Sequence, residues 1–317
     1  MSERLAAAYA RFAENEARGK SPLYEALARG VAADGAVLAF LMTLPPAKRQ
    51  PNLLFAAVRH VCGTQPSWPD FRARLLAQED AVRATMLVRR TQTNEPARCA
   101  VLLPMLARLP PPLALIEVGA SAGLCLLPDR YGYDYGRGWI GGSPGVPVFT
   151  CRAASSVPLP DAVPRIAWRA GLDLDPIDLR DDEQVAWLET LVWPDQPDRL
   201  ERLRAAIAVA RRDPPQVLAG DLLRDLPALA AQRPADTTLV IFHTAVLAYV
   251  GDPAMRAAFA RVVQELGAVW ISNEAPGVFP AIAAKAGRPA RRGFLLAVDG
   301  EPVAWTDPHG AWIDGIG

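Results

Sequence analysis

Hydrophobic positions recur at helical spacing throughout the first third of the chain. Leu5, Tyr9 and Phe12 fall on one face of a helix, with polar residues between them. The pair Ser21-Pro22 has the signature of a helix start, with serine as the N-cap and proline at the first helical position. No β-rich segment interrupts this region. The pattern therefore predicts an N-terminal helical cap domain over residues 1–109.

The pattern changes after a run of three prolines, where short apolar runs begin to alternate with helical stretches. Such alternation is typical of a mostly parallel sheet with helices on both faces, so we expect an α/β domain over residues 110–317. Amphipathic helices are expected within residues 182–212 and 253–266. Residues 129–164 are rich in Tyr, Gly and Pro, and we expect them to form an inserted hairpin and loop. The predicted strands are Leu113–Val118, Arg165–Leu172, Gln216–Ala219, Thr238–Phe242, Ala268–Ser272, and a final hairpin of Phe294–Val298 and Val303–Trp305.

Composition supports a folded protein and narrows its partners. Hydrophobic residues make up 51% of the 317 residues, and the 34 basic side chains balance the 34 acidic ones. A nucleic-acid binder usually carries a basic excess, so we expect no nucleic-acid partner. No uncharged apolar stretch has the length of a membrane span, and the charged N-terminus does not resemble a signal peptide, so we expect a cytoplasmic protein with no membrane partner. The four cysteines lie far apart, so no metal site is expected.

The predicted strand Leu113–Val118 runs into a loop of small residues, Gly119 to Gly123, and then into Leu124–Leu127, which we predict to open a helix. A strand, a small-residue turn and a helix together aim backbone N–H groups and the positive end of the helix at a ligand. Small side chains are needed in such a turn because a Cβ would block the approach of the ligand to the backbone.

Of two interpretations of this loop, a dinucleotide-binding motif fits poorly and a hydrolase motif fits in part. A dinucleotide-binding GxGxxG motif would require glycine where the chain has Ser121 and Leu124. The segment matches the GxSxG nucleophile elbow of hydrolases, and the late His309 completes the order Ser, Asp, His. That elbow, however, follows several strands of its own sheet, whereas residues 1–109 offer only helices.

A third interpretation is that the segment resembles motif I of class I S-adenosylmethionine-dependent methyltransferases, with serine replacing the middle glycine. The resemblance implies a Rossmann-type, methyltransferase-like domain that binds S-adenosylmethionine. Glu117 would hold the ammonium group of the methionine moiety. The loop amides of Gly119, Ala120, Ser121 and Gly123 would hold its carboxylate.

Two later segments extend this resemblance. Asp173 follows the second predicted strand, at the place of the acid that holds the ribose hydroxyls in these enzymes. Asp221 lies in a Gly-Asp segment after the third strand, which resembles the one whose aspartate reaches the adenine amino group. Acids at the carboxyl ends of successive strands lie where an open α/β sheet binds ligands. The insertion makes the spacing from the loop to Asp173 unusually long. Each acid could instead cap a turn or a helix.

Six segments of the chain carry a further resemblance: Asn52–Val58, Thr91–Glu95, Glu117–Leu124, Asp129–Tyr135, His243–Tyr249 and Ser272–Glu274. Together they resemble an uncharacterised bacterial family, known as domain of unknown function 2332. The resemblance covers nearly the whole chain, but it implies no activity. Cys125 stands where an asparagine is expected in that family.

Methyl transfer mainly requires alignment of the acceptor with the methyl group, and a base only for a poorly nucleophilic acceptor. His243 follows the fourth predicted strand and could act as that base. Glu274 and Asn273 follow the next strand, where the carboxylate could bind a cationic acceptor. We therefore predict His243 and Glu274 as catalytic, although each could equally have a structural role.

A densely polar segment between two predicted helices supplies the remaining candidates. Arg90, Thr91 and Asn94 could reach over the cofactor as a lid or bind a polar substrate, and we group Asn273 with them as substrate-binding. The leading hypothesis is a methyltransferase acting on an unknown small-molecule acceptor. The alternatives are a serine hydrolase using Ser121 and a non-catalytic cofactor-binding protein of the same fold. The oligomeric state stays open.

Overall fold

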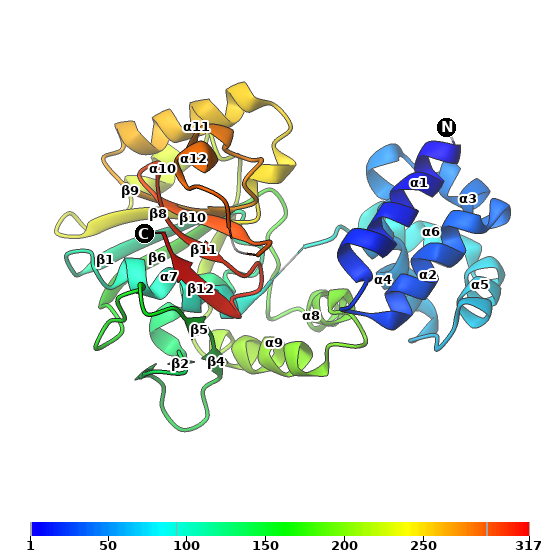
Figure 1. Cartoon of the computed structure of the whole chain (residues 1–317), viewed down its shortest axis with the longest axis horizontal. Helices are drawn as coiled ribbons and strands as arrows, with labels where there is room; N and C mark the ends of the chain where they lie inside the picture. The colour runs from blue at the N-terminus through cyan, green and yellow to red at the C-terminus, as the bar shows by residue number, and fades with distance from the viewer. Residues whose placement is uncertain (1, 93, 290, 317) are drawn as a thin grey trace. The chain divides into compact units, whose positions relative to one another are not determined.

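The computed structural model in Figure 1 describes residues 2–92, 94–289 and 291–316. The chain forms two compact units. The first, here called the helical unit, comprises residues Met1–Thr93 and Asp182–Glu201. The second, the sheet unit, comprises Asn94–Asp181 and Arg202–Gly317. The predicted domain boundary lay at residue 109. The helical unit instead ends its first segment at residue 93 and takes in a segment from the middle of the chain.

Helices form the helical unit, as the apolar spacing predicted. Ser21 accepts a hydrogen bond from Tyr24 N at 3.0 Å and caps α2, and Asp34 caps α3 in the same way. A segment from beyond residue 180 also belongs here, and its Trp187 is buried in the core of this unit. The helices are α1 (Ser2–Phe12), α2 (Pro22–Ala33), α3 (Gly35–Met42), α4 (Pro51–Cys62), α5 (Trp68–Ala77), α6 (Glu79–Val88), α8 (Asp182–Leu191) and the start of α9 (Pro197–Ala210).

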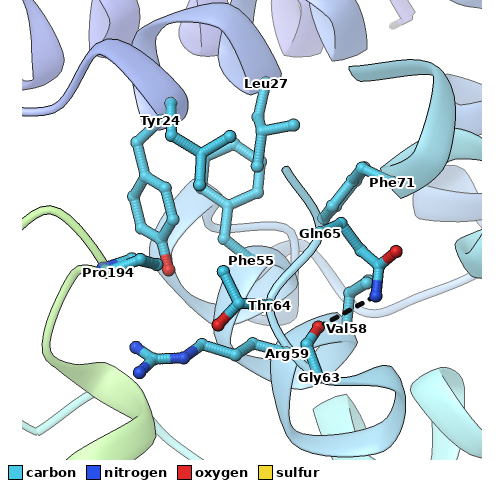
Figure 2. Close-up of a pocket in the computed structure, with 11 residues that line it drawn as sticks. Tyr24, Leu27, Phe55, Val58, Arg59, Gly63, Thr64, Gln65, Phe71 and Pro194 are labelled. Carbon is cyan, nitrogen blue, oxygen red and sulfur yellow. Dashed lines mark hydrogen bonds between the residues drawn. The ribbon is translucent and has the colours of Figure 1, made fainter. Parts of the chain in front are cut away.

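Aromatic side chains from separate helices meet at Phe55 of α4. The ring of Tyr24 lies 4.8 Å from that of Phe55, and the ring of Phe71 lies 5.7 Å from it. Figure 2 shows these rings around a small cavity that Arg59 also lines. The walls are mainly apolar, and the Arg59 guanidinium donates to the carbonyls of Thr190 and Val192. This cavity is therefore a packing gap in the core of the helical unit.

A nine-stranded sheet forms the centre of the sheet unit, in the order β5-β12-β11-β10-β9-β8-β1-β6-β7. Neighbouring strands from β9 to β7 run parallel, whereas β10, β11 and β12 add antiparallel pairings. The mixed α/β fold with a mostly parallel sheet is thus confirmed. All seven predicted strands are present, whereas β5 and β12 were not predicted. The strands are β1 (Leu113–Val118), β5 (Arg152–Ala153), β6 (Ile166–Asp173), β7 (Gln216–Ala219), β8 (Thr238–Thr244), β9 (Val269–Glu274), β10 (Phe294–Val298), β11 (Glu301–Thr306) and β12 (Trp312–Gly315).

Strand β1 is central, and all six of its residues are buried. Among the described residues, no strand precedes it in the chain. Successive strands β6 and β7 lie on one side of β1, and β8 and β9 lie on the other. From β1 the chain first adds β6 and β7 on one side and then β8 and β9 on the other, so the strand order reverses between β1 and β8. Open α/β sheets bind ligands at such a reversal.

Helices cover the sheet around this point. Residues of α10 (Leu226–Ala230), α11 (Pro253–Glu265) and α12 (Pro280–Lys285) pack in one core with the strands, on the side visible at the top of Figure 1. Helix α7 (Cys99–Leu106) is buried along its whole length. No described helix has both the length and the apolar character required to cross a membrane.

The predicted insertion at 129–164 forms its own three-stranded sheet from β2 (Gly132–Asp134), β3 (Trp139–Gly141) and β4 (Val148–Thr150). Three buried tyrosine hydroxyls fasten it to the rest of the unit. Tyr131 donates to Leu124 O at 3.0 Å, Tyr133 to Pro128 O at 2.6 Å, and Tyr135 to Ala100 O at 2.6 Å. The tyrosines of this segment are therefore anchors for the insertion.

Candidate functional site

The glycine loop follows β1 and depends on backbone conformations that favour glycine. Gly119 and Gly123 have φ of 72° and 70°, and Ser121 has φ of 51°. A Cβ at Gly119 would lie 2.4 Å from both methyl carbons of Val246, so that side chain already covers the glycine. Glycine is needed at residue 119 for its conformation and for this close contact.

The prediction of a helix directly after the loop is wrong. The chain forms two short 3₁₀ turns instead, Leu124–Leu126 and Pro128–Arg130. The residue before a proline avoids the α conformation, and Leu127 precedes Pro128. The loop therefore lacks the positive end of an α-helix that the sequence led us to expect.

The loop amides are all engaged inside the chain. The amides of Gly119 and Ala120 donate to Leu172 O at 2.7 and 3.3 Å, and that of Gly123 donates to Ala120 O at 2.7 Å. Side chains accept from the remaining two amides, those of Ser121 and Ala122. None of the five is free for a ligand carboxylate without a rearrangement.

Two predicted site residues, Asn94 and Asp173, bind the middle of the loop. The Ser121 amide donates to Asp173 Oδ2 at 2.8 Å. The Ala122 amide donates to Asn94 Oδ1 at 3.0 Å, and Asn94 Nδ2 donates to Ser121 Oγ at 2.7 Å. The structure thus brings Asn94, Ser121 and Asp173 together, although they are far apart in sequence.

The predicted acids follow neighbouring strands but have different surroundings. Asp221, after β7, accepts from the amides of Leu223 and Arg224 at 2.9 and 3.0 Å, so one of its oxygens caps a turn. Glu117, near the end of β1, is 4% exposed, and its Oε2 has no hydrogen-bond partner among the described residues. Burial raises the pKa of Glu117 well above its usual range, and the nearby Arg98 offsets only part of this rise.

A buried arginine that the sequence reasoning missed ties this edge of the sheet together. Arg98 Nη1 donates to Thr244 O at 3.0 Å and to Thr244 Oγ1 at 3.2 Å, and its Nε donates to Pro308 O at 2.8 Å. Glu95 Oε2 lies 3.7 Å from His309 Nδ1. Nothing in the sequence distinguishes Arg98 from an ordinary helix residue.

His243 and Glu274 form a buried pair. His243 Nδ1 lies 2.7 Å from Glu274 Oε1, and the Trp270 indole N–H donates to His243 Nε2 at 3.0 Å. Because the indole can only donate, we assign the imidazole proton to Nδ1, where it is donated to Glu274. Both ring nitrogens are therefore occupied.

Glu274 also fixes the loop after β8. Its Oε1 accepts from the amides of Val246 and Leu247 at 2.8 and 3.0 Å. Burial raises the pKa of Glu274, but the hydrogen bond and the electrostatic attraction from His243, together with the hydrogen bonds from the two amides, outweigh it, so the pKa is lowered. The carboxylate thereby holds Val246, the residue that covers Gly119.

The remaining residues predicted to bind substrate are Asn273, Arg90 and Thr91. Asn273 is fully buried, and its Oδ1 accepts from Thr306 Oγ1 at 2.7 Å. Arg90 and Thr91 belong to the helical unit. There the Arg90 carbonyl accepts from Trp187 Nε1 at 2.9 Å, and the Thr91 hydroxyl bonds Gln50 Oε1 at 2.9 Å.

The comparisons with known proteins identify a family and no activity. The profile of a family described as an uncharacterized protein conserved in bacteria (DUF2332) matches residues 6–314. The chain therefore belongs to this family. No curated protein and no solved structure matches the chain.

Proposed function

We propose that this member of the family is an S-adenosylmethionine-dependent methyltransferase that acts on a small molecule. The order of the five parallel strands supports the proposal. Numbered along the chain, β7, β6, β1, β8 and β9 are the third, second, first, fourth and fifth of them. Doubly wound, Rossmann-type sheets have this same order and bind ligands where the order reverses, and the glycine loop follows β1 at that point.

Oε2 of Glu117, which has no hydrogen-bond partner among the described residues, supports the proposal most directly. A buried carboxylate oxygen without a partner is costly, and such atoms are rare in folded proteins. Glu117 lies two residues before Gly119, at the spacing of the acid in methyltransferase motif I. An ammonium group bound there would supply the missing donor and the opposite charge. The methionine moiety of the cofactor has such a group.

The rest of the site fits the cofactor in part. Both oxygens of Asp173 accept backbone amides, from Ser121 and Asp175 at 2.8 Å each, so it would hold the ribose hydroxyls through its remaining lone pairs. Asp221 keeps one oxygen for the adenine amino group. The carboxylate of the cofactor would require the Ala122 amide, which Asn94 occupies, so the Asn94 side chain must turn away first. When bound, the cofactor supplies the electrophilic methyl group.

The surroundings of His243 favour an acceptor that needs no strong base. To accept a proton at Nε2, the imidazole would have to give up the hydrogen bond from Trp270. An acceptor that is already nucleophilic at neutral pH does not have to transfer a proton to His243. The catalytic role of His243 stays a prediction.

Calorimetric titration with S-adenosylmethionine and S-adenosylhomocysteine tests the proposal. We expect binding to the parent protein and a loss of affinity of at least about tenfold in Glu117→Gln, because a charge-assisted hydrogen bond is removed. Glu301→Gln, which changes an exposed carboxylate on β11, is the matched control and should bind like the parent. If the parent protein binds neither compound, the proposal is wrong.

A serine hydrolase is the second candidate, since Ser121 has the positive φ of a strained turn. The hydrogen bond of its hydroxyl runs to Asn94, and His243 is paired with Glu274 and Trp270. We therefore expect no labelling of the protein by a fluorophosphonate probe. Labelling that disappears in Ser121→Ala would establish the hydrolase instead.

A further inference from the structure

Arg98 is a buried cation whose hydrogen bonds all run to uncharged oxygens. The residue is 5% exposed, and its guanidinium stays charged. Nε donates to Pro308 O, and Nη1 donates to Thr244 O and Thr244 Oγ1. Within residues 2–92, 94–289 and 291–316, no carboxylate forms an ion pair with it. Because a buried charge is costly unless an opposite charge pairs with it, Arg98 has the character of an anion-binding group.

One nitrogen of this guanidinium is able to bind a ligand. The bonds to Pro308 and Thr244 use Nε and Nη1. Nη2 makes no hydrogen bond to a described residue, and it is not one of the fully enclosed atoms. Its N–H groups are therefore donors that a molecule from solution can reach.

The guanidinium lies where the strand order of the sheet reverses. Thr244 is the last residue of β8, and Glu117 lies near the end of the neighbouring strand β1. Arg98 attracts Glu117 electrostatically, but neither a hydrogen bond nor an ion pair between the two is found in the described part of the chain. Two buried, opposite charges thus lie near each other at the edge where open α/β sheets bind ligands.

We infer that the methyl acceptor carries a carboxylate and that Arg98 Nη2 binds it. The inference rests on the proposed function, in which an ammonium group compensates the charge of Glu117. The positive charge of Arg98 then has to be balanced by another anion. A carboxylate matches the single charge of the guanidinium, whereas a phosphate dianion would add an excess negative charge beside Glu117. The acceptor class is therefore a small carboxylic acid.

The test uses sodium acetate and the Nε–H signal of Arg98 in the ¹⁵N-labelled full-length protein. Arg98→Gln assigns this signal, which belongs to the group bound to Pro308 O. The titration is run at constant ionic strength and at about pH 8, so that Glu117, whose pKa is raised, carries more of its charge. We expect acetate to shift the signal with half-saturation on the order of 10 mM. Acetamide, which has the shape of acetate without its charge, should leave the signal in place.

A matched pair of variants tests whether the acetate binds beside Glu117. Glu117→Gln removes a negative charge next to Arg98, so it should strengthen acetate binding about fivefold. Glu301→Gln changes the net charge equally, but at an exposed residue of β11, and should bind acetate as the parent does. Saturating S-adenosylhomocysteine should also strengthen acetate binding to the parent, because its ammonium group compensates Glu117.

Three results would overturn the inference: an Arg98 signal that does not move up to about 200 mM acetate, an equal shift with acetamide, or equal acetate affinities in Glu117→Gln and Glu301→Gln. Displacement of acetate by S-adenosylhomocysteine would also overturn it, and would assign Arg98 to the carboxylate of the cofactor itself. If acetate binds as expected but neither cofactor compound binds, the proposed methyltransferase fails and Arg98 stays an anion site. If the cofactor binds and acetate does not, only the acceptor class is wrong.

Discussion

The Asn94 side chain binds the glycine loop, and its Nδ2 donates to the hydroxyl oxygen of Ser121 at 2.7 Å. Its carbonyl oxygen accepts from the Ala122 amide at 3.0 Å. The carboxamide therefore takes the acceptor place that a ligand carboxylate would otherwise fill. Asn94 is also the first residue of the sheet unit after the helical unit ends.

If Asn94 competes with the cofactor, Asn94→Ala should strengthen S-adenosylmethionine binding by about fivefold, because about 1 kcal/mol of hydrogen bonding no longer has to be broken. The same variant should lose about 1–2 kcal/mol of stability to urea. Calorimetry and urea unfolding measure the two effects. Asn52→Ala, which removes a hydrogen bond to Trp193 in the helical unit, should leave the affinity unchanged. Weaker binding in Asn94→Ala would instead make Asn94 a ligand contact.

Gly119 and Val246 should be energetically coupled. Gly119→Ala forces a side chain into a left-handed conformation and against the Val246 methyl groups, so we expect it to cost at least about 2 kcal/mol of unfolding free energy. Combining it with Val246→Ala should recover about 1 kcal/mol relative to the sum of the two single changes. Urea unfolding of the four proteins gives this coupling.

Gly267→Ala isolates the conformational part of that effect. Gly267 has φ of 63°, but an added Cβ would meet no atom within 4 Å. We expect a loss of only about 1 kcal/mol, from the left-handed backbone alone. Equal losses in Gly119→Ala and Gly267→Ala would show that Val246 does not crowd the loop.

Glu117 should make the stability of the free protein fall as pH rises. Its pKa is raised in the folded state, so folding retains a proton that the unfolded chain has already lost. The unfavourable effect begins above the unfolded pKa of about 4.3 and is complete once the pH passes the folded pKa, with a slope of at most about 1.4 kcal/mol per pH unit.

Glu117→Gln should therefore be more stable than the parent at neutral pH and less dependent on pH above about 5. Urea unfolding of both proteins across this range measures the difference. The variant that stabilises the free protein is the same one that should weaken cofactor binding. A parallel pH dependence in both proteins would mean that Glu117 has found a partner in solution.

The sequence predicted the sheet well where burial alone decides the structure. Leu113–Val118 is an apolar run that is buried on both faces, and it forms β1 with the predicted bounds. Strand β12 was missed because Trp312–Gly315 is short and is defined by its pairing with β11. Pairing between distant segments leaves no periodicity to detect.

The site was predictable in its members but not in its contacts. The polar segment and the acids drew attention to Asn94, Asp173 and Glu117, and the structure brings the first two onto the loop. The sequence does not show that Asn94 binds the loop amide, since that contact depends on the tertiary fold. Nor does it show Arg98, whose partners Thr244 and Pro308 lie more than a hundred residues away.

The connection between β6 and β7 has a consequence for how the protein is made. Trp187 completes the core of the helical unit, and its indole bonds the Arg90 carbonyl. A nascent chain that has reached only residue 93 lacks this side chain, so the core formed by α1 to α6 is not complete until about a hundred further residues have been made. Fragments that end before α8 should expose apolar surface and aggregate. Expression of the helical unit alone would require residues 182–201 to be linked to residues 1–93.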